Sequence, residues 1–217
     1  MRLRNIPRAE GVLQECRQVI KNETACRGSW NQVFGNQQPI YIEIGMGKGK
    51  FLLEHALRNP QINYIGIERY SSVLLRAVEK SQELEEAPEN LRFICMDAAD
   101  IANVFAPGEV FCIYLNFSDP WPKARHARRR LTSLDFFARY DKILTADGTV
   151  EFKTDNRGLF DFSLEQLEEC PSFTTQKYTF DLHHEPDMNE GNVLTEYEEK
   201  FSSLGNPICK LIAVRRA

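Results

Sequence analysis

The chain has 217 residues, 42% hydrophobic and 27% charged, a balance typical of a soluble protein with one core. Its net charge of -4 argues against a protein that coats nucleic acid non-specifically, although a local basic site is still allowed. No apolar stretch approaches the length of a membrane span, and the start of the chain lacks the apolar segment of a signal peptide. We therefore expect a cytoplasmic α/β protein with no membrane contact, in which Cys95 and Cys112 are buried free thiols.

The N-terminal segment precedes the main β-rich pattern. An amphipathic helical pattern covers residues 8–20, and a loop follows it. This arrangement predicts an N-terminal helical appendage, residues 1–38, attached to a main domain that spans residues 39–217.

Short β-rich runs alternate with helical runs through the main domain. Most of the β-rich runs are apolar on both faces, which is typical of a parallel sheet covered by helices. The five expected strands cover residues 39–45, 63–68, 91–97, 110–117 and 148–154. Helical spacing appears at residues 49–58, 70–86, 128–144 and 157–169. Five βα units in succession predict a doubly wound sheet with right-handed crossovers.

The C-terminal part departs from this alternation. Residues 172–182 and 207–216 have the pattern of two further strands, and a loop and a helix over 195–203 separate them. The parallel series is therefore expected to end in a hairpin-like pair of strands.

A glycine-rich turn, EIGMGKGKF, joins the first strand of the main domain to its helix. Glycine lets the backbone turn sharply there and lets a ligand approach closely. A P-loop would need Ser or Thr after Gly49-Lys50, where the chain has Phe51, and a dinucleotide fingerprint would need its third glycine at residue 50. The turn therefore departs from both motifs, and Gly45 and Gly47 are candidate cofactor-binding residues.

Three acidic residues close successive strands beside this turn. Glu43 ends the first strand, Glu68 the second and Asp97 the third. Any one of them alone would most often be solvated, but together at the ligand-binding edge they favour a nucleoside cofactor. Glu68 suits the ribose hydroxyls and Asp97 the adenine. A carboxylate at Glu43 would repel a pyrophosphate and suits the cationic amino group of S-adenosylmethionine.

The fourth strand runs into the segment NFSDPWPKARHARRR. Ser118 and Asp119 fall at the carboxyl edge of the sheet, and Pro120 and Pro122 predict a stiff, extended exit from the strand. Arginines follow, and they are expected to open the next helix, where positive charge opposes the helix dipole. Such a run is usually a solvated helix face, but its place at the mouth of the expected pocket favours phosphate contact. Trp121 either stacks on a substrate base or packs as a plug.

The combined motifs resemble those of the bacterial tRNA (guanine-N7-)-methyltransferases. The matching strings are IEIGMGKGKF, GIERY, NFSDPWPKARHARRRL, FKTDN and NVLTEYEEKF, in order from residue 40 to about residue 201. The resemblance implies a Rossmann-like class I methyltransferase fold, a seven-stranded, doubly wound, mostly parallel sheet with one antiparallel strand near the C-terminus. It also implies methyl transfer from S-adenosylmethionine, without a metal, to N7 of the variable-loop guanosine at position 46 of tRNA.

The same resemblance implies roles for individual residues. Contacts with S-adenosylmethionine are implied for Glu43, Glu68, Asp97 and Asp119, and Asp119 is also the implied catalytic residue. Substrate contacts are implied for Lys123, Asp155, Thr195, Glu196, Tyr197 and Glu198. RNA contacts are implied for Arg125, His126, Arg128, Arg129 and Arg130. Two positions depart from the usual pattern, Met46 in the glycine turn and Ala124 at a frequently basic position.

The expected reaction needs no general base, because guanine N7 carries a lone pair and no proton. We therefore expect Asp119, together with Asp155, to accept hydrogen bonds from guanine N1 and N2 and to stabilise the charge that the purine gains. Thr195 and Glu198 also have the spacing of an N-cap and its capping-box partner, a role that is compatible with substrate contact.

Two other functions stay open at this point. A class I methyltransferase for an exocyclic amine would usually carry a second proline where this chain has Trp121. An RNA-binding module without a cofactor is disfavoured by the intact acidic residues. A NAD-dependent oxidoreductase is disfavoured by the displaced glycine and by the missing catalytic His or Tyr. His183 and His184 have no further ligand at metal-binding spacing, and the sequence leaves open whether the protein is a monomer or a homodimer.

Overall fold

The computed structural model describes residues 6–216, and over this range eight strands form one sheet. All five predicted parallel strands are present, as are both C-terminal strands. Their bounds are β2 (Ile40–Ile44), β3 (Asn63–Glu68), β4 (Leu91–Cys95), β5 (Val110–Asn116), β6 (Leu144–Thr154), β7 (Phe173–Thr179) and β8 (Cys209–Arg215). The eighth strand, β1 (Val19–Ile20), pairs in parallel with β4.

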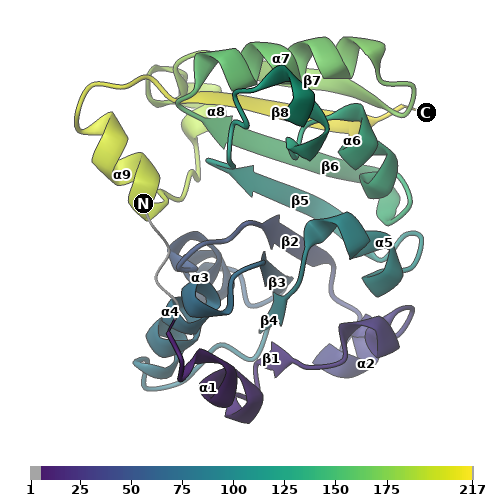
Figure 1. The fold of residues 1–217 in the computed structure, drawn as a ribbon, viewed down its shortest axis with the longest axis vertical. Coiled ribbons are helices and arrows are strands. Elements are labelled where there is room, and N and C mark those ends of the chain that lie inside the picture. The colour runs from purple at the N-terminus through teal and green to yellow at the C-terminus, as the bar shows by residue number, and fades with distance from the viewer. Residues whose placement is uncertain (1–5, 217) are drawn as a thin grey trace.

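The strand order is β1-β4-β3-β2-β5-β6-β8-β7 (Figure 1). Strand β8 runs antiparallel to both of its neighbours, β6 and β7, and every other pair in the sheet is parallel. The expected Rossmann-like, mostly parallel sheet with one antiparallel strand near the C-terminus is therefore confirmed. The expected seven strands become eight because β1 extends the sheet beyond β4.

Helices cover both faces of the sheet, and each face has its own apolar core. The first face carries α1 (Ala9–Glu15), α3 (Lys50–Arg58) and α4 (Ser71–Gln82). The second carries α2 (Trp30–Phe34), α5 (Ile101–Val104), α6 (Leu134–Tyr140) and α7 (Arg157–Glu169). Trp30 is fully buried in the second core, and its indole Nε1 donates to the Val104 carbonyl over 3.0 Å. The N-terminal segment thus contributes to the sheet through β1 and to the core through Trp30.

The segment between β7 and β8 leaves the sheet and returns. It contains the short turn η4 (Leu182–His184), α8 (Pro186–Asn189) and α9 (Glu196–Ser202). Figure 1 shows α9 on the side toward which the arrowheads of β5 and β6 point. This helix therefore stands beside the carboxyl edge of the sheet, where the sequence placed the candidate site.

Two predicted helices are wrong in their extent. The helix expected over residues 8–20 ends at Glu15, because residues 19 and 20 pair with β4 instead. The helix expected over residues 128–144 begins only at Leu134, and the basic run forms the 3-10 turn η3 (Ala124–Arg129). Ser133 Oγ donates to the Arg128 carbonyl over 3.3 Å, the kind of side-chain bond that competes with a helix. The arginines therefore do not oppose a helix dipole.

The other expected helices are close to their predicted bounds, and two further 3-10 turns are η1 (Glu23–Cys26) and η2 (Ala98–Asp100). All six cysteines are free, as expected. Cys112 is buried, but the prediction for Cys95 is wrong, because this residue ends β4 at the carboxyl edge and is exposed.

Candidate active site

The glycine turn joins β2 to α3 at the carboxyl edge of the sheet. Gly45, Gly47 and Gly49 have φ angles of 75°, 57° and 74°, the left-handed region that favours glycine. A Cβ atom on Gly49 would lie 2.7 Å from the Cβ of Ala77 in α4. Glycine is therefore needed here both for backbone conformation and for the close contact between α3 and α4.

Glu43 is 2% exposed and lies at the end of β2, directly before this turn. Its Oε1 accepts a hydrogen bond of 2.8 Å from Nδ2 of Asn116, which ends β5. Within residues 6–216, Glu43 Oε2 and Asn116 Oδ1 are buried without a hydrogen-bond partner. Burial raises the pKa of Glu43 to about 8, with the Asn116 hydrogen bond and Lys153 opposing this shift. Two buried acceptors without donors form a site that suits a cationic donor.

Glu68 ends β3, and Asp97 lies two residues past the end of β4, where it caps η2. Glu68 Oε2 accepts from the Gly47 amide over 3.2 Å, and Oε1 accepts from the Tyr70 amide over 3.0 Å. Burial raises the pKa of Glu68, and these backbone hydrogen bonds oppose the shift. Asp97 is exposed, accepts from the Ala99 amide over 2.9 Å and lies 3.5 Å from Arg69 Nε. Each carboxylate oxygen has two lone pairs, so both side chains can still accept from a ligand.

The segment after β5 turns sharply instead of leaving the strand extended. Phe117 and Trp121 have φ angles of 50° and 42°, in the left-handed region that side chains rarely adopt. Asp119 lies between them and is exposed. Burial is the main cause that raises the pKa of Glu68, and the negative charge of Asp119 raises it further. The expected extended exit is therefore wrong, and the turn that carries Asp119 holds backbone strain at the carboxyl edge of the sheet.

A pocket of about 200 Å³ opens between the glycine turn and α9. Glu43, Asn116 and Phe117 line its inner wall, and Thr195, Glu196 and Tyr197 line the opposite side. The Tyr197 ring packs at a tilt against Phe117, with ring centroids 4.8 Å apart, and its hydroxyl lies 3.4 Å from Asp155 Oδ2. The structure therefore brings three expected cofactor residues, Glu43, Gly45 and Gly47, and part of the expected substrate residues around one cavity. Glu68, Asp97 and Asp119 are not among the residues that line it.

Helix α9 begins with the expected N-cap but without the full capping box. Thr195 Oγ1 accepts from the Glu198 amide over 2.9 Å. The Glu198 side chain is fully buried and instead binds Lys153 Nζ at 2.6 Å. His183 and Asn192 bind its other oxygen at 3.0 and 2.9 Å. Burial alone would raise the pKa of Glu198, but Lys153, Asn192 and His183 lower it below its usual value.

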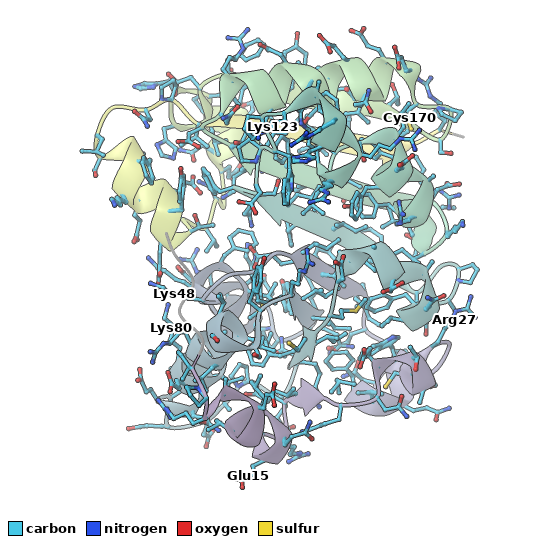
Figure 2. All side chains as sticks on the ribbon, in the orientation of Figure 1. Glu15, Arg27, Lys48, Lys80, Lys123 and Cys170 are labelled. Carbon is cyan, nitrogen blue, oxygen red and sulfur yellow. The ribbon has the colours of Figure 1, made fainter. Side chains whose placement is uncertain are left out.

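Ion pairs also join α9 to the glycine turn and to α4. Lys48 Nζ lies 3.1 Å from Glu196 Oε2, and Lys80 also contacts Glu196. Lys50 contacts Glu199. Figure 2 shows Lys48 and Lys80 below α9, on the side of the carboxyl edge. These contacts link α9 to the glycine turn and to α4 across the mouth of the pocket.

The side chains of the basic segment differ in what they contact. Lys123 and Arg125 are exposed, and no carboxylate among the described residues pairs with them (Figure 2 labels Lys123 in front of the sheet). The Arg128 side chain is 89% exposed and lies 3.8 Å from Asp135. Arg129 lies over the Trp121 ring at 5.0 Å, and His126 packs edge-on against the same ring. Arg130 instead turns back toward the Asp119 segment.

Two site residues were missed by the sequence interpretation, Asn116 and Lys153. Asn116 is the strand-end partner of Glu43, and Lys153 is the buried partner of Glu198. A signal was present for Lys153, because a lysine inside the apolar strand VEFKT must find an anion if it is buried.

Metal and membrane features complete the description. Within residues 6–216, no group of three or more His, Cys, Asp and Glu side chains is arranged to hold a metal ion. No helix in the same range has the length and apolarity needed to cross a membrane.

Comparison with known proteins gives the family. Residues 37–211 match the family described as "Putative methyltransferase". The chain is 57% identical over 215 residues to the tRNA (guanine-N(7)-)-methyltransferase of Lachnoclostridium phytofermentans, and the match covers 99% of each chain. It is 48% identical over 209 residues to the protein of the same name from Bacillus subtilis, covering 96% of each.

Solved structures agree on the fold. The 16S rRNA methyltransferase KamB superposes with a TM-score of 0.63 at 12% identity, covering 87% of this chain and 93% of that chain. This likeness concerns the fold alone, whereas the two near relatives match almost end to end. The chain belongs to the tRNA (guanine-N(7)-)-methyltransferase family and is an S-adenosylmethionine-dependent methyltransferase.

Proposed function

We propose that this protein transfers a methyl group to N7 of a guanosine in tRNA, at variable-loop position 46. The observation that carries the proposal is the buried acceptor pair, Glu43 Oε2 and Asn116 Oδ1, beside the strained turn that holds Asp119. Relatives named tRNA (guanine-N(7)-)-methyltransferase support the choice of substrate. S-adenosylmethionine supplies the methyl group when it is bound.

On the cofactor side, the acceptor pair fits the ammonium group of the methionine part. Gly45 and Gly47 leave the space without side chains that a bound molecule needs. Glu68 and Asp97 follow in the sheet order and suit the ribose and adenine. Each of these groups has acceptor capacity left after its own backbone contacts, which supports the assignment.

On the substrate side, Asp119 and Asp155 accept hydrogen bonds from the guanine N1 and N2 groups and stabilise the charge that forms on the purine. Tyr197 is 42% exposed and lines the pocket, and its ring stacks on Phe201 and packs at a tilt against Phe117, so we assign its hydroxyl rather than a ring face to substrate contact. Thr195 and Glu196 line the same pocket.

Glu198 does not line the pocket with Thr195, Glu196 and Tyr197. Because its side chain is fully buried and bound to Lys153, we assign it the role of holding the loop rather than touching the base.

On the RNA side, Lys123, Arg125 and Arg128 are exposed cations at the mouth of the site and suit phosphates. His126 and Arg129 pack on Trp121, which supports the packing role for this tryptophan. A cytoplasmic protein that acts as a monomer or homodimer, without a metal, is part of the same proposal.

The test is a methyl-transfer assay with labelled S-adenosylmethionine and two unmodified tRNA transcripts. One carries guanosine at position 46 and the other adenosine, and the products are cleaved chemically at 7-methylguanosine. Label at position 46 of the first transcript and none on the second is the expected result. Label on an exocyclic amine, or on neither transcript, would contradict the proposal.

The Asp119→Asn variant in the same assay tests how the site acts. Loss of the carboxylate should lower turnover about a hundredfold, the usual effect of removing one stabilising group in a transition state. Near-normal turnover with weaker tRNA binding would show that Asp119 only positions the substrate.

A further inference from the structure

Arg130 belongs to the basic run, yet it is only partly exposed and its guanidinium contacts protein. Its Nε donates to the Pro120 carbonyl over 3.0 Å, and a terminal nitrogen donates to the Trp121 carbonyl over 3.2 Å. The guanidinium carbon lies 4.2 Å from the centre of the Phe162 ring in α7. Arg130 thus connects α7 to the two peptide groups on either side of Trp121.

These two peptide groups need such a partner. Trp121 stands in the left-handed region at a φ of 42°, and Phe117 at 50° brackets the turn on its other side. Residues other than glycine are strained in the left-handed region, so surrounding contacts must hold them. Proline supplies no amide hydrogen at residues 120 and 122, which removes two donors that could stabilise the turn from within.

Neighbouring arginines differ from Arg130 in this respect. The Arg128 side chain is 89% exposed and has a long contact of 3.8 Å with Asp135. Arg129 lies against the outer surface of Trp121. Only for Arg130, among residues 124–130, does the structure place two hydrogen bonds on the backbone of the Asp119 turn.

We propose that Arg130 is a positioning residue that holds the Asp119 turn in its reactive conformation, and that it does not bind tRNA phosphate. The inference rests on the function proposed above and assigns one arginine of the basic segment a separate role. A planar guanidinium suits it, because its fixed fork reaches two carbonyls at once while one face packs on Phe162.

The deciding variant is Arg130→Lys, because it keeps the positive charge and loses the fork. We expect the single-turnover methylation rate at saturating tRNA to fall about ten- to a hundredfold, the effect of a small misplacement of reacting groups. The Kd for tRNA and the slope of log Kd against log salt should match the wild type. The matched control is Arg27→Lys, at an exposed arginine outside the site whose Nε also donates to a backbone carbonyl, that of Ala102, and it should keep both the rate and the salt slope.

Neutral variants separate the two roles further. Arg128→Ala should weaken tRNA binding and lower the salt slope by about one, as expected for one lost phosphate contact. Arg130→Ala should lower the rate and leave the slope unchanged. If Arg130→Lys keeps the wild-type rate, or Arg130→Ala lowers the salt slope as Arg128→Ala does, the proposal is wrong.

A second variant covers the case in which Arg130→Lys does not fold. Phe162→Leu keeps the guanidinium and removes its aromatic support, and a smaller loss of rate with unchanged tRNA affinity is expected. An unchanged rate would contradict the proposal.

Acrylamide quenching of tryptophan fluorescence gives a readout that is independent of catalysis. The chain has two tryptophans, and Trp30 is fully buried, so quenching reports Trp121. Quenching should increase in Arg130→Lys and stay unchanged in Arg128→Lys. If the wild-type protein does not methylate tRNA, the proposed function is wrong. Fluorescence quenching would still test whether Arg130 holds the turn at Trp121.

Discussion

Burial raises the pKa of Glu43 to about 8, so the carboxyl group of the free protein holds its proton near pH 7. Its unbonded Oε2 can bind an ammonium group well only after that proton has left. Cofactor binding should therefore release a proton and become tighter as the pH rises toward 8.

We expect the affinity for S-adenosylmethionine to rise roughly tenfold between pH 6 and pH 7.5, because binding is linked to loss of one proton. Glu43→Gln should bind more weakly at pH 7.5 and lose this pH dependence. Equilibrium binding of S-adenosylmethionine, measured across this pH range, tests the prediction. The control is Glu54→Gln on the exposed side of α3, which should keep the pH dependence of the wild type. A wild-type affinity that does not change with pH would argue against an ionised Glu43 in the complex.

The stability of the cofactor-free protein should also depend on pH through Glu43. The unfolded chain loses the Glu43 proton near pH 4.5, whereas the folded chain keeps it until about pH 8. The contribution of Glu43 to the free energy of unfolding is therefore greatest below pH 4.5 and is lost as the pH rises toward 8. Denaturant unfolding should show Glu43→Gln gaining most over the wild type at pH 8 and least near pH 4.5.

At the scale of an element, α9 is held at its root by the buried pair of Lys153 and Glu198. Lys153 Nζ also binds Asn192 Oδ1 and the Val193 carbonyl, each over 3.0 Å, so the ammonium group has three acceptors. Burial lowers the pKa of Lys153, and Glu198 opposes this shift. The exposed ion pairs at the other side of α9 are more solvated and should contribute little.

Lys153→Met should lower the free energy of unfolding by about 3–5 kcal/mol, because Glu198 would stay buried without its cation. Adding Glu198→Gln should recover part of that loss, since the two residues act as one unit. The exposed pair supplies the matched control, and Lys80→Met should cost less than about 1 kcal/mol. Denaturant unfolding of the four proteins gives the comparison. Equal losses for Lys153→Met and Lys80→Met would mean that the buried pair does not fix the helix.

At the scale of the whole molecule, the sequence predicted the sheet better than the turns. The five parallel strands were predictable because continuous apolar runs are typical of strands buried on both faces. Strand β1 was not, since two residues are too few for any periodicity. The left-handed backbone at Phe117 and Trp121 depends on contacts such as those of Arg130, which lie outside the local sequence. The glycine turn and the strand-end acids were predictable because topology alone brings strand ends together.

Charge distribution over the whole molecule leads to the last prediction. The chain carries a net charge of -4, so attraction to RNA must come from the exposed cations of the basic segment. If Lys123, Arg125 and Arg128 each contact one phosphate, log Kd for tRNA should rise with log salt with a slope of about 3.

Replacing all three residues by alanine should bring this slope close to zero and should leave S-adenosylmethionine affinity unchanged. Lys142→Ala removes an exposed cation just before β6, at the opposite edge of the sheet, and should keep the wild-type slope. Filter binding at several salt concentrations tests both variants. A slope that survives the triple replacement would place the phosphate contacts elsewhere on the surface. Loss of the slope in the triple variant alone would mean that tRNA binds in one orientation, with the basic segment on its phosphates.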